Sequence, residues 1–85
     1  MQLKESKPTK RDISKILSRR ITGWNDKRLT YNRIKLTTRL SYDEMSDLEA
    51  NLTSMFPDYT FCIGNVRWEE QKSAPRVVTA ISFWK

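Results

Sequence analysis

Histidine is absent from this 85-residue sequence, and cysteine occurs once, at Cys62. Metal sites need histidine and cysteine ligands or grouped carboxylates at ligand spacing, and the sequence shows neither pattern. General acid–base catalysis most often uses histidine. Since Cys62 also lacks a base partner, we expect a buried, unreactive thiol between Phe61 and Ile63. The composition therefore predicts a non-catalytic protein without a metal or another cofactor.

Glycine, proline and long apolar runs are scarce as well. Two glycines and three prolines disfavour a disordered or low-complexity chain. The longest nearly apolar stretch, residues 77–84, is far shorter than the ~20 residues that span a bilayer. The first ten residues lack the apolar segment of a signal peptide, and a lone cysteine cannot form an intrachain disulfide. We therefore expect a cytoplasmic protein that does not contact a membrane.

Positive charge is abundant, and it is concentrated in one half of the chain. Residues 1–39 contain 12 lysines and arginines against three acidic residues, a net charge of +9. Residues 40–85 contain four against seven, a net charge of −3. A surface of one sign attracts partners of the opposite sign. The sequence contains no glycine-rich phosphate loop and no nucleophile motif, so nothing in it suggests a small-molecule substrate. We therefore expect a binding protein whose partner is DNA or RNA.

The candidate contacts are cations of the N-terminal half, with two aromatic residues among them. Cations recur at four-residue steps along a predicted helix and at two-residue steps along a predicted strand. If helix and strand share one surface, these side chains form a stripe that follows a phosphate backbone. The aromatic rings would stack on unpaired bases, although a core position for Trp24 is the alternative. The candidate set is Lys10, Arg11, Lys15, Arg19, Arg20, Trp24, Lys27, Arg28, Tyr31, Arg33, Lys35 and Arg39.

An acidic protein surface is the alternative partner, because charge complementarity also steers protein association. The chain would then be a small inhibitor or adaptor of the kind that phages and mobile elements encode. Its basic face would occupy an acidic or nucleic-acid-binding site of a host enzyme. The sequence leaves open which of the two partners is correct, and it also leaves the oligomeric state open.

The helices are predicted from their caps and from the spacing of apolar residues. A flexible basic arm, residues 1–9, precedes a single α+β domain, residues 10–85. The first helix is predicted over 10–22, with Thr9 as its cap and Gly23 as its end. The second helix is predicted over 42–56. The segment Ser41-Tyr42-Asp43-Glu44 forms a capping box before it, and Pro57 ends it.

The strands are predicted from alternation of apolar and polar residues. Residues 31–40 alternate between an apolar and a basic face, and residues 76–84 are apolar on both faces. Residues 59–68 change phase at Gly64-Asn65, which predicts a hairpin turn or a bulge there. Residues 25–27 are predicted to be a turn.

The predicted order is therefore a basic N-terminal helix followed by β-α-β-β, with one further strand if Gly64-Asn65 is a turn. The sheet would have three or four mainly antiparallel strands, covered on one face by the helix at 42–56. A right-handed parallel crossover around that helix is a further option. The apolar residues expected to meet between helix and sheet are Met45, Leu48, Leu52, Met55, Phe56, Ile34, Leu36, Phe61, Ile63 and Ile81.

Overall fold

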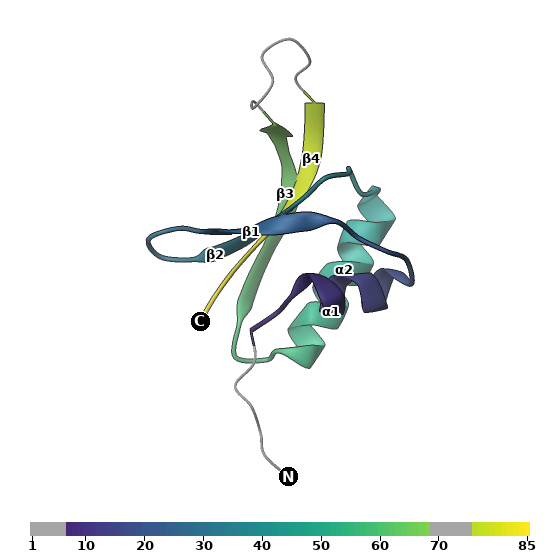
Figure 1. The fold of residues 1–85 in the computed structure, drawn as a ribbon. Coiled ribbons are helices and arrows are strands. Elements are labelled where there is room, and N and C mark those ends of the chain that lie inside the picture. Colours follow the sequence, from purple (N-terminus) through teal and green to yellow (C-terminus); the bar gives the residue numbers. More distant parts are fainter. Residues whose placement is uncertain (1–6, 69–75) are drawn as a thin grey trace.

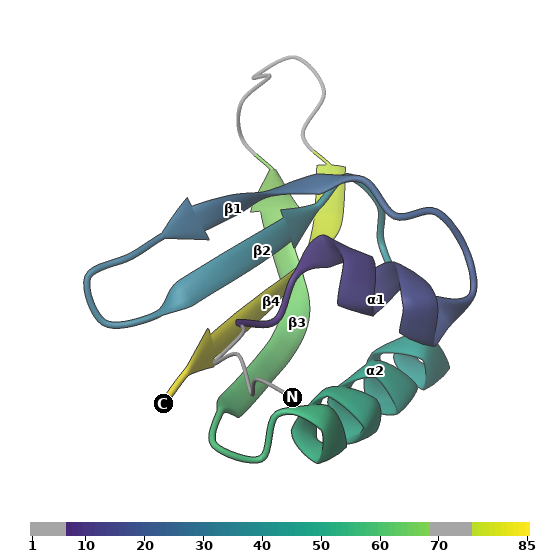
Figure 2. The same ribbon diagram turned by 60° about the horizontal axis from the view of Figure 1, so that its bottom comes forward.

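The computed structural model describes residues 7–68 and 76–85, and it has the predicted α+β class (Figure 1). Two helices lie against one face of a four-stranded antiparallel sheet (Figure 2). The predicted arm lies largely outside the described residues, although Pro8 is buried and Thr9 caps the first helix. The elements in chain order are α1 (Lys10–Leu17), β1 (Gly23–Lys27), β2 (Asn32–Leu36), α2 (Tyr42–Met55), β3 (Thr60–Trp68) and β4 (Arg76–Trp84).

Both helices begin as their sequences predict, but α1 ends earlier than expected. Thr9 and Ser41 each form a complete capping box with the acidic residue three positions later. Helix α1 stops at Leu17, because Ser18 adopts the left-handed conformation (φ 55°) that closes a helix end. The prediction that Gly23 ends this helix is therefore wrong, and Gly23 begins β1 instead.

The strand order is β1-β2-β4-β3, and every neighbouring pair is antiparallel. The connection through α2 carries the chain from β2 past the position of β4 to β3. Since β2 and β3 each run antiparallel to β4, they run in the same direction, so α2 forms the parallel crossover that the sequence left open, with β4 between the two strands. The β3–β4 pair is the longest, running from Thr60 opposite Trp84 to Trp68 opposite Arg76.

Strand β1 is the main departure from the predicted order. Residues 25–27 are not a turn, because they pair with β2 through a register that sets Asn25 opposite Ile34. The reversal of the chain lies in the following loop, where the Arg28 N–H donates to the Tyr31 carbonyl at 2.9 Å. Residues 23–36 therefore form a hairpin, and the sheet gains its fourth strand at this end.

Strand β3 is continuous, so Gly64-Asn65 is neither a turn nor a bulge. Gly64 lies opposite Ala80, and Asn65 lies opposite Thr79, without an extra residue. The change of phase has a different cause. Phe61 and Ile63 pack toward the helices, whereas Val66 and Trp68 belong to the other face of the same strand.

The core lies between the helices and the sheet, as the apolar spacing predicts. Leu48 and Leu52 of α2 are fully buried, and α1 contributes Ile13. Met55 is an exception, because its side chain is 47% exposed. The next residue, Phe56, packs against the core as expected. The sheet residues of this core are Ile34, Leu36, Phe61, Ile81 and Phe83, with Ile63 at its border.

Candidate functional site

The second face of the sheet, which we call the open face, points away from the helices. Neither of the two helices in the described ranges covers it, since both pack on the opposite side of the sheet. Alternate residues of a strand point to opposite faces, so the pairing registers define which side chains it carries. They are Trp24, Asp26, Tyr31, Arg33, Lys35, Thr60, Cys62, Gly64, Val66, Trp68, Arg76, Val78, Ala80, Ser82 and Trp84.

One end of the open face is closed by its own side chains. The rings of Trp24 and Trp68 meet edge to face, with centroids 4.6 Å apart, although their strands lie at opposite edges of the sheet. Lys35 Nζ lies 5.9 Å from the Trp24 ring, and the Arg76 guanidinium lies 4.3 Å from the Trp68 ring. We call these four residues the tryptophan cluster. Each ring has a cation beside it, a favourable arrangement for the negative face of an indole.

Val78 shows that part of the open face is buried even though no described helix covers it. Val78 belongs to the open face, yet it is fully buried and is not part of the core beneath the helices. Ala80 of the same face is also buried, so the open face has buried apolar side chains apart from the core beneath the helices.

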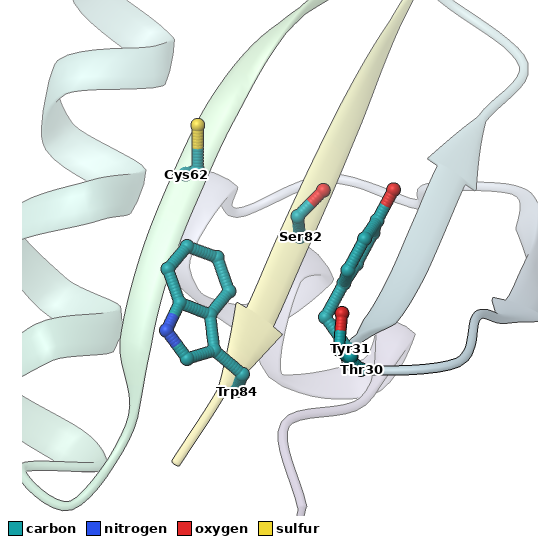
Figure 3. A pocket seen from close by; sticks show the side chains of 5 residues that line it. All are labelled: Thr30, Tyr31, Cys62, Ser82 and Trp84. Atoms are coloured by element: carbon teal, nitrogen blue, oxygen red, sulfur yellow. The ribbon is translucent and has the colours of Figure 1, made fainter.

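The other end of the open face contains a cleft of about 490 Å³, which we call the aromatic cleft. It is lined by Thr30, Tyr31, Cys62, Ser82 and Trp84 (Figure 3). The rings of Tyr31 and Trp84 have centroids 6.4 Å apart at an angle of 66°. Ser82 lies between the two rings in this view, and the indole lies toward Cys62. Small side chains between two large rings leave the space that forms the cleft.

A shared carboxylate organises the arginines beside the aromatic cleft. Asp26 accepts from Arg28 at 2.8 Å and from Arg33 at 3.2 Å. The Arg33 side chain is only 16% exposed, and its Nε atom is buried without a hydrogen-bond partner in the described part of the chain. One carboxylate faces two guanidinium groups, so the local charge remains positive.

The candidate cations of helix and strand do not share one surface. Arg33 and Lys35 lie on the open face, whereas α1 belongs to the helical layer behind the sheet. Arg11 and Lys15 are exposed on α1. Arg19, just after α1, pairs with Glu44 at 2.8 Å. The continuous stripe that the sequence suggested is therefore divided into two separate basic regions.

The remaining candidates lie in connections or at strand ends. Lys10 donates from its ammonium group to the Gly23 carbonyl at 2.6 Å, so it ties α1 to β1. Arg20 and Arg39 are exposed in the connections that follow α1 and β2. Lys27 is exposed at the end of β1, where it borders a hollow of about 310 Å³ that adjoins the aromatic cleft.

Sequence reasoning missed several residues of the open face. The prediction of a buried Cys62 is wrong, because this side chain is exposed. Phe61 and Ile63 point toward the helices, so the residue between them points to the opposite side of the sheet. Trp84, at the end of a segment predicted to be apolar on both faces, was not among the candidates, and it is 36% exposed in the aromatic cleft. Alternation within β3 and β4 was the signal that would have placed both residues correctly.

Comparison of the chain with protein-family models, with curated proteins and with solved structures found no match in any of the three. In the described ranges, no helix has the length and apolar character needed to cross a membrane. The same ranges contain no group of three or more side chains of the kinds that hold a metal ion.

Proposed function

We propose that this protein binds nucleic acid through the open face, with its cations on backbone phosphates. The observation that carries this proposal is that Arg33, Lys35 and Arg76 lie on one face together with accessible aromatic rings. In the described strands, Asp26 is the acidic residue on this face, and two arginines already engage it. The face therefore presents more positive charge than its own carboxylate neutralises.

Phosphate binding follows from the chemistry of these groups. Guanidinium groups donate two parallel hydrogen bonds to a phosphate, and an ammonium group acts as a compact point charge. Lys35 of β2 lies opposite Ala80 of β4, and Arg76 stands four residues before Ala80, so the backbone positions of the two cations are offset by about 13 Å along the strand direction. Two phosphates of one strand can therefore be contacted at once, and each contact releases counterions from the nucleic acid.

An acidic protein surface remains the second candidate, and two exposed apolar side chains favour it. Leu29 is fully exposed in the hairpin loop, and Tyr42 is 80% exposed at the start of α2. Exposed apolar surface marks protein contacts where it is contiguous. However, Leu29 borders the hollow beside the aromatic cleft and Tyr42 begins α2, so these two residues do not account for the rings and cations of the open face together.

The test compares two variants that lose the same charge. Lys35→Gln with Arg76→Gln neutralises the open face, and Arg11→Gln with Lys15→Gln neutralises α1 as the matched control. Binding of labelled single- and double-stranded oligonucleotides is followed by fluorescence anisotropy from about 50 to 200 mM salt. We expect the open-face variant to bind more weakly and to lose about 1.4–1.8 from the slope of log K against log salt, for two lost phosphate contacts.

The outcomes separate the alternatives. Circular dichroism checks that both variants remain folded. Equal losses in both variants would mean that total charge, and not the open face, drives binding. A loss only in the α1 variant would move the site to the helical layer. If the unmodified protein binds neither oligonucleotide at about 50 mM salt, the proposal is wrong, and a pull-down from nuclease-treated lysate tests the acidic protein partner.

A further inference from the structure

The aromatic cleft offers a flat ligand two rings over a floor of small side chains. Its volume of about 490 Å³ lies within the ~300–1,000 Å³ of typical ligand sites. Ser82 and Cys62 form part of the lining, and neither is large enough to fill the space beside the indole of Trp84 (Figure 3). Tyr31 stands at 66° to that indole, so the two rings do not stack on each other and leave ring surface for a ligand.

The groups around the aromatic cleft are hydroxyls and cations. Thr30 and Ser82 contribute hydroxyl groups to its lining, and Arg33 lies directly opposite Ser82 in the strand register. The adjoining hollow of about 310 Å³ shares Thr30, Tyr31 and Trp84 with the cleft. That hollow is bordered by Lys27 and Arg28. A ligand that is flat, aromatic and attached to negative charge complements all of these groups.

We propose that the aromatic cleft binds an unpaired base of single-stranded nucleic acid. This inference rests on the proposed function and specifies its ligand. The phosphates on either side of the base would run toward Arg33 and Lys35 in one direction and toward Lys27 and Arg28 in the other. Bases of a duplex are stacked within the helix, so their faces cannot enter the cleft. Stacking accepts any base, because every base has a π face.

Cys62 supplies a reporter inside the cleft. It is the one cysteine of the sequence, it is exposed, and it lines the cleft. The rate of its alkylation by iodoacetamide is measured by mass spectrometry with and without oligo(dT) or oligo(U) of about 10 nucleotides, a length within the site sizes of single-strand binders. We expect each oligonucleotide that binds to slow alkylation in proportion to the bound fraction. An abasic strand of equal length carries the same charge without bases, and it should bind without protecting Cys62.

Two substitutions of Trp84 test stacking directly. Trp84→Phe keeps an aromatic face, whereas Trp84→Leu keeps apolar volume without one. We expect Trp84→Leu to weaken binding of oligo(dT) or oligo(U) by about 5- to 140-fold, the usual loss for one stacked base. Trp84→Phe should retain most of the affinity, and both variants should bind the abasic strand as the unmodified protein does.

The results distinguish failure of this inference from failure of the proposed function. Salt-dependent binding of oligonucleotides without protection of Cys62 would refute the base site and leave nucleic-acid binding in place. Equal protection by the abasic strand or by a duplex would refute it too, as would equal affinities of Trp84→Phe and Trp84→Leu. Absence of binding to every strand would refute the proposed function itself. Protection by only one of oligo(dT) and oligo(U) supports the site and shows which of the two strands it prefers.

Discussion

Replacing Gly23 by alanine tests whether the β1–β2 hairpin is seated as described. A Cβ atom at this position would lie 2.4 Å from the Lys35 carbonyl oxygen and 3.0 Å from the Leu36 Cα. Both neighbours are backbone atoms of β2, so no side chain can rotate away. The φ angle of Gly23 is not positive, so the effect of the substitution is steric and involves no disallowed backbone conformation. Strand β1 must therefore shift away from β2.

The expected size of the effect follows from the cost of overpacking. Inserting a methyl group where the structure cannot give way costs about 1–3 kcal/mol. A domain of this size has a total stability of about 4–13 kcal/mol, so the loss is a large fraction of it. The expected fall in melting temperature is about 4–24 °C, at 4–8 °C per kcal/mol. The shift of β1 also moves Trp24 relative to Trp68, which lies 4.6 Å away.

Gly64→Ala is the matched control for this experiment. No atom lies within 4 Å of a Cβ at Gly64, which is also in a strand and also has no positive φ. Alanine there should be neutral or stabilise the protein by about 0.4–1 kcal/mol through the unfolded chain. Thermal unfolding by circular dichroism, near-ultraviolet signals of tryptophan and oligonucleotide binding are measured for both variants. Equal melting temperatures for the two variants would refute the close approach of β1 to β2.

Two further predictions concern stability. Hydrogen bonding from the Ser41 backbone N–H, helped by Arg19, holds the pKa of Glu44 below its ordinary value of 4.5. A lowered pKa of Glu44 stabilises the fold above pH 4.5, and this stabilisation is lost as the pH falls through the lowered value. Glu44→Gln should therefore be less stable than the unmodified protein at pH 7 and equally stable in acid. Urea unfolding at both pH values measures this difference. The buried Thr79 hydroxyl accepts from the Leu40 N–H at 2.8 Å, and valine at this position would leave that donor unpaired. Thr79→Val should therefore lower the free energy of unfolding by about 1–3 kcal/mol. Thr79→Ser keeps the hydroxyl and should lose less, and equal losses in the two variants would show that the hydrogen bond is not what matters.

Helix starts and strand faces could be predicted because their signals are local. Thr9 with Asp12, and Ser41 with Glu44, form hydrogen bonds over three residues, so the sequence contains the whole motif. Alternation in residues 31–36 likewise assigned the basic side chains of β2 to one face. These interactions depend on nearest neighbours along the chain and not on the rest of the fold.

Strand β1 was missed because its sequence carries no strand pattern. Gly23-Trp24-Asn25-Asp26-Lys27 has turn-forming residues at its centre and one large apolar side chain. Its strand conformation depends on the ladder with β2 and on the contact between Trp24 and Trp68, which are 44 positions apart in the sequence. Tertiary pairing overrode the local preference, and this also explains why Gly23 was interpreted as the end of a helix.

The sequence by itself determined the excess of positive charge, the absence of histidine, the helix caps and the alternation within strands. The tertiary structure decided which of the basic groups lie together. Both helices pack on the same side of the sheet, so the cations of α1 are separated from those of β2. The strand order brings Tyr31 beside Trp84 and leaves the aromatic cleft uncovered by either helix of the described chain. Charge and capping arise from single residues and their neighbours, whereas an exposed face is defined by which elements cover it.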